Sequence, residues 1–558
     1  YGTLFMAYCA DLAEQYEVLL GWVNGGNSSR IGSFLPDPLC GPPPEHDPRT
    51  MRVLRQPPAT GPMRLKTPRL AESYIGLSWS LYLFAPPLQF VQALPSMAIE
   101  EQPQKPESLP PARPGCPHAS AKALSFGPDA AADSSLETGR RILRWLQQTG
   151  AGKKEWRTYL DEPGAREKGW QRAVWAAIRA DHGGLLETPA GYLVGTHALV
   201  LKVLRDDGRK FSVREAGKRI KPSLGQFHLG LDSYTEAYRR EAPTCNKALE
   251  AISEPGSFDL ARQHTSDILL EALQRGQPPV RIDVLKDLLE PVAARMAPKW
   301  FGLPDETYVV TRVSHWNAPA EPAAFPGHFW NSSRYAFNPF TSAETERLSA
   351  IDGQAIVAAV TKHVSAIGRH KLSGTVAQAI GNDMASYPTD ADVGRVLAGA
   401  MLGWISTTLG TGSRLLDDWI STGEFARQQL SWVGATGNFD TARSHFEDAM
   451  LKSIGLQPVP ENKHRVVAGH FTCLNGRWLK KGRLVILGLE SSCAEQAENN
   501  VTDSHIYFGL ANAGARPPHG CPARSLALGM LFGMLAAMSE TVNIRYGDGR
   551  LLADISPR

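Results

Sequence analysis

The segment "YFGLANAGARPPHGCPARSLALGMLFGMLAAM", Tyr507–Met538, carries the most informative pattern in the chain. Gly514 and two prolines indicate a loop, and the uncharged run 525–539 predicts a buried helix that is too short to span a bilayer. Cys521 therefore falls just before a helix N-terminus, with His519 two residues earlier. Such a position lowers the pKa of a thiol and favours the thiolate, which is the form that binds metals. Cys521 is thus a candidate metal ligand, and the alternative is a buried free cysteine.

The composition is that of a globular chain. Of 558 residues, 59 are Lys or Arg and 56 are Asp or Glu, which leaves a formal charge of +3, and 42% are hydrophobic. The basic residues form no stripe, so no nucleic-acid partner is expected. Seven cysteines without a CxxC pair indicate neither a disulfide framework nor a zinc site. Because no signal peptide is recognisable at Tyr1 either, we expect a reducing, cytoplasmic compartment.

Residues 73–99 are a possible membrane segment, because 27 consecutive positions carry no Asp, Glu, Lys or Arg. Pro86, Pro87 and Pro95 would interrupt a continuous apolar helix there. We interpret the stretch as a strand and turn, and we expect no membrane span.

Three parts follow one another along the chain. Residues 1–97 alternate short apolar runs with Pro/Gly turns in an α+β pattern, and 98–135 form a Pro-rich linker. Of the 41 prolines, 19 lie in the first 118 residues. Residues 136–558 are mostly helical, with two small β stretches at 191–203 and 465–489, the second turning at Asn475-Gly476. Amphipathic helices are predicted at 136–148, 170–181, 248–275, 353–368, 390–420 and 442–454.

The loop around Cys521 resembles the heme-binding loop of cytochromes P450. The resemblance implies a P450-like helical fold with small β-sheets and a heme b whose iron Cys521 ligates axially as a thiolate. His519 would hold a heme propionate, and Ala523 fits the small residue that follows the cysteine. Gly514 and Pro517 depart from the family pattern, which usually has Phe and Gly at these places.

"RVLAGAMLGWISTTLGTGSRLLDDWI", Arg395–Ile420, resembles the central helix that covers the heme in this family. An acid followed by Thr normally relays protons to bound dioxygen, and here Ser406 and Thr407 occupy these two places. The hydroxyl is kept while the acid is replaced. The alternative for Thr407 is a hydroxyl that bonds back to its own helix.

The ExxR pair of the family is absent or degenerate, because no Arg lies three residues after Glu447 and Gly455 stands near the usual Arg. Arg465 fits the family's arginine after the following turn, which often meets a propionate, or else it is a surface charge.

Residues 1–97 resemble the last third of a dye-decolorizing peroxidase, an α+β ferredoxin-like domain. "YGTLFMAYCADLAEQYEVLLGWVNGG" at 1–26 resembles the start of this part, whose first strand, with Leu4 and Phe5, would line the distal heme pocket, and Leu83-Phe84-Ala85-Pro86 matches its closing signature. The heme ligands of that family precede this strand, so the chain would be the rear part of a peroxidase/P450 fusion protein.

Together these resemblances imply a heme-thiolate oxidoreductase, a monooxygenase or peroxygenase that inserts oxygen into a small apolar organic substrate. The oxidant would be O2, with a ferredoxin and reductase in trans, or a peroxide, which the missing relay acid favours. The alternatives are a hydroperoxide-rearranging heme enzyme and a catalytically degenerate P450-like domain that binds without turnover.

Overall fold

A computed structural model describes residues 50–53, 63–66, 136–160, 169–302, 332–333, 335–338, 341, 343–432, 437–499, 506–509, 517–547 and 551–558. The chain divides into two compact units, Tyr1–Ala121 and Lys122–Arg558, which are described separately. In the first unit, strand β1 (Thr50–Val53) pairs antiparallel with β2 (Met63–Lys66). The predicted strands and peroxidase-like motifs of residues 1–97, the linker 98–135 and the uncharged stretch 73–99 otherwise lie outside the described residues. The three-part division therefore stays a prediction.

The second unit is mostly helical with small sheets, as predicted for a P450-like fold. Its N-terminal helices and helical turns are α4 (Leu136–Gln148), α5 (Lys153–Leu160), α7 (Trp170–His182), α8 (His197–Leu204), α9 (Arg214–Leu224), η4 (His228–Gly230), α10 (Glu236–Glu250), α11 (Glu254–Arg275), η5 (Val284–Leu289) and α12 (Glu290–Phe301). The C-terminal ones are α15 (Ala343–Ile367), η6 (Arg369–Lys371), α16 (Thr375–Asn382), α17 (Asp390–Ser421), α18 (Glu424–Ser431), α19 (Phe439–Leu456), α20 (Leu489–Glu498), η7 (Ile506–Phe508) and α21 (Arg524–Thr541).

The predicted helices are confirmed with one correction, and one predicted β stretch is corrected as well. The predicted helix 248–275 is wrong as one element, because α10 ends at Glu250 and α11 begins at Glu254. The Ser253 side chain accepts a hydrogen bond from the Gly256 N–H, and this N-cap starts the second helix. The β stretch 191–203 is wrong in its second half, since its strand ends at Val194 and helix α8 follows.

The largest sheet has the strand order β3-β4-β10-β7-β5, and the β4–β10 pair is parallel while the other pairs are antiparallel. A second sheet has the order β11-β12-β6, and β8 pairs with β9 in the predicted hairpin. The strands are β3 (Leu185–Thr188), β4 (Gly191–Val194), β5 (Phe211–Ser212), β6 (Val280–Asp283), β7 (Asn462–Val467), β8 (Thr472–Leu474), β9 (Arg477–Leu479), β10 (Leu484–Gly488), β11 (Val542–Tyr546) and β12 (Leu552–Pro557).

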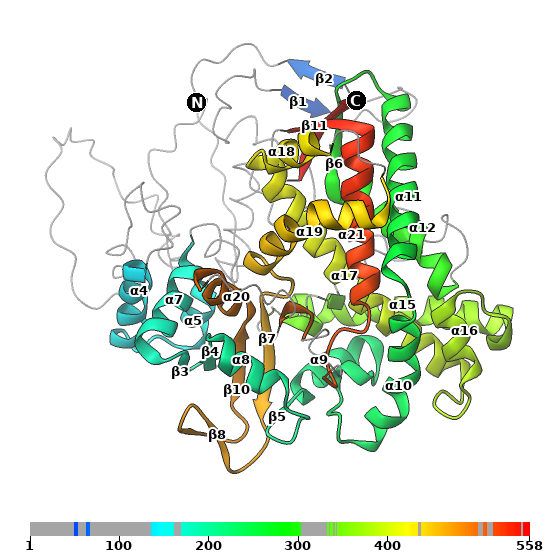
Figure 1. Cartoon of the computed structure of the whole chain (residues 1–558). Coiled ribbons are helices and arrows are strands. Elements are labelled where there is room, and N and C mark those ends of the chain that lie inside the picture. The colour runs from blue at the N-terminus through cyan, green and yellow to red at the C-terminus, as the bar shows by residue number, and fades with distance from the viewer. Residues whose placement is uncertain are drawn as a thin grey trace, which may run out of the picture. The chain divides into compact units, whose positions relative to one another are not determined.

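Helix α21 is the predicted uncharged helix, and it runs alongside α11 through the middle of the unit (Figure 1). Two glycines allow this close approach. A Cβ atom at Gly529 would lie 2.3 Å from the Glu254 carbonyl oxygen, and one at Gly533 would lie 2.3 Å from that of Phe258. The backbones of the two helices therefore touch where these glycines lie.

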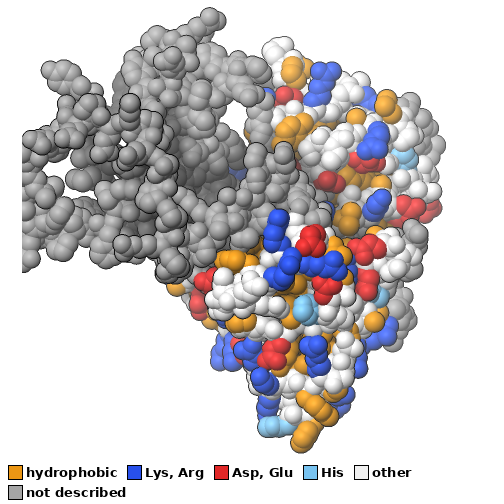
Figure 2. All heavy atoms as spheres, turned by 90° about the vertical axis from the view of Figure 1, so that its left-hand side faces the viewer, with side chains coloured by type: hydrophobic (Ala, Val, Ile, Leu, Met, Phe, Trp, Pro, Cys, Tyr) orange, Lys and Arg blue, Asp and Glu red, His pale blue; other side chains and the backbone are white. Residues whose placement is uncertain are grey.

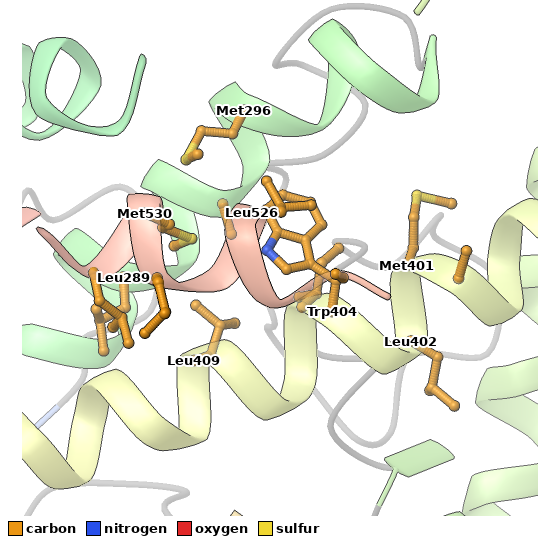
Figure 3. Packing of buried hydrophobic residues seen from close by; sticks show 14 of the residues in the cluster. Leu289, Met296, Met401, Leu402, Trp404, Leu409, Leu526 and Met530 are labelled. Atoms are coloured by element: carbon orange, nitrogen blue, oxygen red, sulfur yellow. The ribbon is translucent and has the colours of Figure 1, made fainter. Parts of the chain in front are cut away.

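Helix α17, 32 residues long, is largely buried and packs against the elements around it. A capping box between Thr389 and Asp392 starts the helix. Trp404 and Leu409 project from α17 toward Leu526 and Met530 of α21 (Figure 3). The Trp404 indole stacks on Phe301 of α12, with ring centroids 5.6 Å apart and an interplanar angle of 15°. These contacts place the buried residues of α17 within the main hydrophobic core.

Candidate functional site

Cys521 lies three residues before the first residue of α21, in the position predicted from the sequence. We call residues 517–523 the cysteine loop. The Cys521 N–H donates to the Phe508 carbonyl at 2.8 Å, and the Gly520 N–H donates to the Pro517 carbonyl at 2.8 Å. Gly509, with φ of +70°, turns the preceding segment tightly against the loop. The partly exposed Cys521 is held by backbone hydrogen bonds on a rigid turn. Gly514 lies outside the described residues.

Helix α10 fixes the other side of the cysteine loop. The Tyr238 hydroxyl donates to the Pro518 carbonyl, and the Tyr238 ring contacts the His519 ring edge-on at 5.2 Å. The ring of His228 in η4 lies 6.3 Å from the Tyr238 ring. His519 is therefore positioned by an aromatic neighbour that the sequence did not single out. A sequence signal for Tyr238 is lacking, because the contact joins residues 281 positions apart.

Strand β7 adds a row of three basic residues, Lys463, His464 and Arg465. The ammonium of Lys463 lies beside Gly509, 3.3 Å from where a Cβ atom there would be. Burial lowers the pKa of Lys463 to about 8, and the positive charge of Arg465 acts in the same direction while Cys521 opposes it. Arg465 is buried, and its pKa falls to about 10 because of that burial, against the attraction of Asp232 and Asp206. Because Arg465 is buried, it is not the surface charge that the sequence left as the alternative.

The lowered pKa of His464 should make the stability of the folded protein depend on pH. Burial first, and then the positive charges of Arg219 and Arg465, lower its pKa to about 3, so it stays neutral in the folded protein. Below about pH 6.5 the unfolded chain gains a proton on His464 that the folded chain does not, so the free energy of unfolding falls as pH falls from about 6.5 toward 3, by about 1.4 kcal/mol per unit for this group. Urea unfolding at about pH 7, 6 and 5 measures the slope. His464→Gln should flatten it and His370→Gln, at an exposed histidine, should not. Equal slopes in both variants would contradict the assignment.

One face of α17 is left partly open. Gly403, Thr407, Thr411 and Arg414 are partly exposed, at spacings of four, four and three residues, while most of the helix is buried. A Cβ atom at Gly403 would meet Leu229 at 3.8 Å and no other described atom within 4 Å outside its own helix. Leu229 belongs to η4, whose His228 neighbours Tyr238 of α10, and the Tyr238 hydroxyl donates to Pro518 of the cysteine loop. The open face of α17 and the cysteine loop are thus joined through η4 and α10.

The two predicted relay residues donate to their own helix. The Ser406 hydroxyl donates to the Leu402 carbonyl at 2.6 Å, and the Thr407 hydroxyl donates to the Gly403 carbonyl at 2.5 Å. This is the alternative that the sequence left open for Thr407. Ser406 is only 2% exposed and lies off the open face, whereas Thr407 lies on it. The structure brings Thr407 to the open face of α17 and does not bring Ser406 there.

Two ion pairs that the sequence did not reveal lie next to the C-terminal end of α19. Arg414 of α17 pairs with Glu461 at 2.6 Å and donates to the Pro458 carbonyl at 2.8 Å. Arg172 of α7 pairs with Glu490 at 2.5 Å and donates to the Leu456 carbonyl at 3.0 Å. These arginines hold the turn after α19, next to Gly455, where the expected ExxR arginine is missing. Glu447 pairs instead with Arg443 on its own helix, at 3.0 Å.

Comparison with known proteins finds likeness in structure and not in sequence. The crystal structure of CalO2, which has a P450-like fold, matches with a TM-score of 0.51 and 14% identity, over 69% of this chain and 94% of that chain. This likeness establishes the fold as P450-like. No family model and no curated protein matches the sequence.

The described residues contain no group of three or more His, Cys, Asp or Glu that could hold a metal ion. No described helix has the length and apolar character that crossing a bilayer requires.

Proposed function

We propose that the second unit binds heme b through the Cys521 thiolate and acts as a heme-thiolate oxidoreductase that inserts oxygen into a small apolar organic substrate. The observation that carries the proposal is the backbone-anchored Cys521 immediately before a buried helix, within a P450-like fold. A single cysteine sulfur is a sufficient protein ligand when a macrocycle supplies the others.

The charges around Cys521 would suit a heme, which carries two negatively charged propionates. Lys463, which is half-buried, and Arg465, which is buried, concentrate positive charge on this strand, while His464 between them stays neutral. Propionate groups near Arg465 and His519 would offset the cost of burying this charge. On α17, a Cβ atom at Gly403 would meet only Leu229, at 3.8 Å, among described atoms outside its own helix, so this part of the helix face is loosely covered. The Trp404 indole N–H is buried without a hydrogen-bond partner among the described residues.

In the proposed mechanism, heme supplies the activation of oxygen, which a thiolate ligand favours by donating electron density. Cys521 would hold the iron of a bound heme, and His519 and Arg465 would orient its propionates. Thr407 Oγ1, already a donor to the Gly403 carbonyl, has lone pairs left to accept a hydrogen bond from water. It would hold that water at the open face of α17, whereas Ser406 is buried off that face.

Ser406 stands where an acid would deliver protons, and the lack of this acid affects which oxidant the protein could use. A peroxide or organic hydroperoxide needs fewer delivered protons than O2 does, so we propose peroxygenase chemistry or a hydroperoxide rearrangement first. Reductant-driven monooxygenation with a ferredoxin and reductase in trans is the other route. We also propose that residues 1–97 form the last third of a dye-decolorizing peroxidase domain.

A carbon monoxide difference spectrum tests the heme assignment. The reduced, CO-bound protein is expected to show the red-shifted Soret band of thiolate ligation, because Cys521 is deprotonated when bound. Cys521→Ala should abolish this band, whereas Cys473→Ala, at an exposed free cysteine, should keep it. An imidazole-type spectrum, or a red-shifted band that survives in Cys521→Ala, would contradict the assignment.

The alternative of a binding domain without turnover is favoured by the missing relay acid and by the two hydroxyls bonded to their own helix. It predicts protein that stays free of heme after expression with excess hemin, or heme-loaded protein that consumes no peroxide in the presence of apolar substrates.

A further inference from the structure

The hairpin β8–β9 presents an exposed aromatic face. Phe471 is 85% exposed and Trp478 is 69% exposed. Cys473 lies directly opposite Trp478 in the register and is exposed on the same face. The alternate residues Thr472, Leu474 and Leu479 are buried, so the ribbon has one face in the protein and one in solvent.

This exposure is not that of a frayed end, because the hairpin is held at several points. Asn475 and Gly476 have φ of +50° and +72°, as a two-residue hairpin turn requires. The Asn475 side chain donates to the Gly183 carbonyl at 3.1 Å, and the Lys480 N–H donates to the Tyr192 hydroxyl at 3.1 Å. Two aromatic side chains are therefore fixed in water, where they gain nothing from burial.

Cationic side chains surround this face. Arg477, Lys480 and Lys481 belong to the hairpin, and Lys480 pairs with Glu187 while the Lys481 ammonium contacts His470 at 2.8 Å. Arg209 and Lys210 lie beside the base of the hairpin, where the Ala468 N–H donates to the Lys210 carbonyl at 2.8 Å. Arg209 pairs with Asp207. Among the described residues, five cations thus lie near three carboxylates, those of Glu187, Asp207 and Asp206, and the Asp206 carboxylate accepts a hydrogen bond from the Lys210 N–H at 3.0 Å.

The same arrangement is visible on the surface. Figure 2 shows orange hydrophobic side chains at the lower tip of the described face, with blue Lys and Arg side chains around them. A narrow tip with an apolar end and a basic rim has little area for a protein interface, which buries about 800 Å² on each partner. A lipid surface requires only a few inserted side chains.

We propose that the hairpin β8–β9 docks on an anionic lipid bilayer. Phe471 and Trp478 enter the boundary between headgroups and acyl chains, where aromatic side chains are favoured. Arg477, Lys480, Lys481 and Lys210 meet the lipid phosphates and carboxylates, and the attraction falls with salt. This docking is peripheral and independent of the proposed heme chemistry.

Sedimentation with vesicles tests the proposal. The whole chain is expected to bind vesicles of phosphatidylcholine with about one third phosphatidylserine at least about tenfold more tightly than pure phosphatidylcholine, since each of the four cations near such a surface contributes up to about a fivefold gain. Phe471→Ser with Trp478→Ser should weaken binding about tenfold or more on the scale of interfacial insertion. Lys480→Gln with Lys481→Gln should remove much of the phosphatidylserine dependence and keep the weaker apolar part.

Leu430→Ser is the matched control, because Leu430 is 75% exposed on α18 and should not affect vesicle binding. Circular dichroism of every variant checks that it folds. The proposal is overturned if the parent chain does not bind the anionic vesicles, or if both hairpin variants bind as the parent does. Self-association that the aromatic substitutions abolish, without vesicle binding, would assign the face to a second copy and also overturn it.

Discussion

Gly533→Leu is expected to destabilise the second unit by more than about 3 kcal/mol, because the new side chain would begin inside the backbone of α11. A Cβ atom at Gly533 would lie 2.3 Å from the Phe258 carbonyl oxygen and 2.8 Å from the Arg262 nitrogen. Backbone atoms cannot rotate away as a flexible side chain can, so α11 and α21 would have to separate. Leucine gains about 1 kcal/mol of helix propensity over glycine, which is too little to compensate. Denaturant unfolding followed by far-UV circular dichroism measures the loss.

Gly403→Ala is the matched control for this substitution. It also replaces a glycine within a long helix, but its Cβ atom would meet only Leu229, at 3.8 Å, among described atoms outside its helix. This variant should be unchanged or slightly more stable. If Gly533→Leu proves as stable as Gly403→Ala, the close contact between α11 and α21 is wrong.

Arg414→Met is expected to cost about 3 kcal/mol, because it leaves the carboxylate of Glu461 buried without its arginine. The Glu461 side chain is only 9% exposed, and its ion pair with Arg414 measures 2.6 Å. The same substitution removes the hydrogen bond from Arg414 to the Pro458 carbonyl, so the turn after α19 loses two anchors. Urea unfolding of the free protein measures the change.

Arg443→Met provides the comparison, since its pair with Glu447 joins neighbouring turns of one partly exposed helix. We expect about 0.5 kcal/mol or less there. In the double variant Arg414→Met with Glu461→Met no charge is left unpaired, so it should be more stable than Arg414→Met alone. Equal effects of Arg414→Met and Arg443→Met would show that the pair with Glu461 does not anchor the turn.

The helices and the place of the cysteine were predictable because they depend on local pattern. The run of uncharged residues after Cys521 predicted α21, and the period of apolar residues predicted α4 and α17 nearly to the residue. The Asn475-Gly476 turn predicted the hairpin, since few residue pairs accept positive φ at both positions. The break between α10 and α11 was missed because the cap at Ser253 interrupts a continuing apolar period.

The surroundings of the site were decided by tertiary structure. Tyr238 meets His519, Lys463 lies beside Gly509, and Arg414 meets Glu461, and each contact joins elements that no local pattern relates. The sequence indicated that the ExxR pair is absent or degenerate, but it could not show which arginines hold the turn after α19.

The sequence by itself determined that a cysteine on a proline-rich loop precedes a buried helix in a mostly helical chain, because helix periodicity, proline and glycine act over a few residues. Only the tertiary structure decided which face of α17 stays open, which cations gather beside the cysteine and which aromatic residues remain in solvent. Burial and charge at a site are sums over elements distant in sequence, and they are fixed only when those elements pack together.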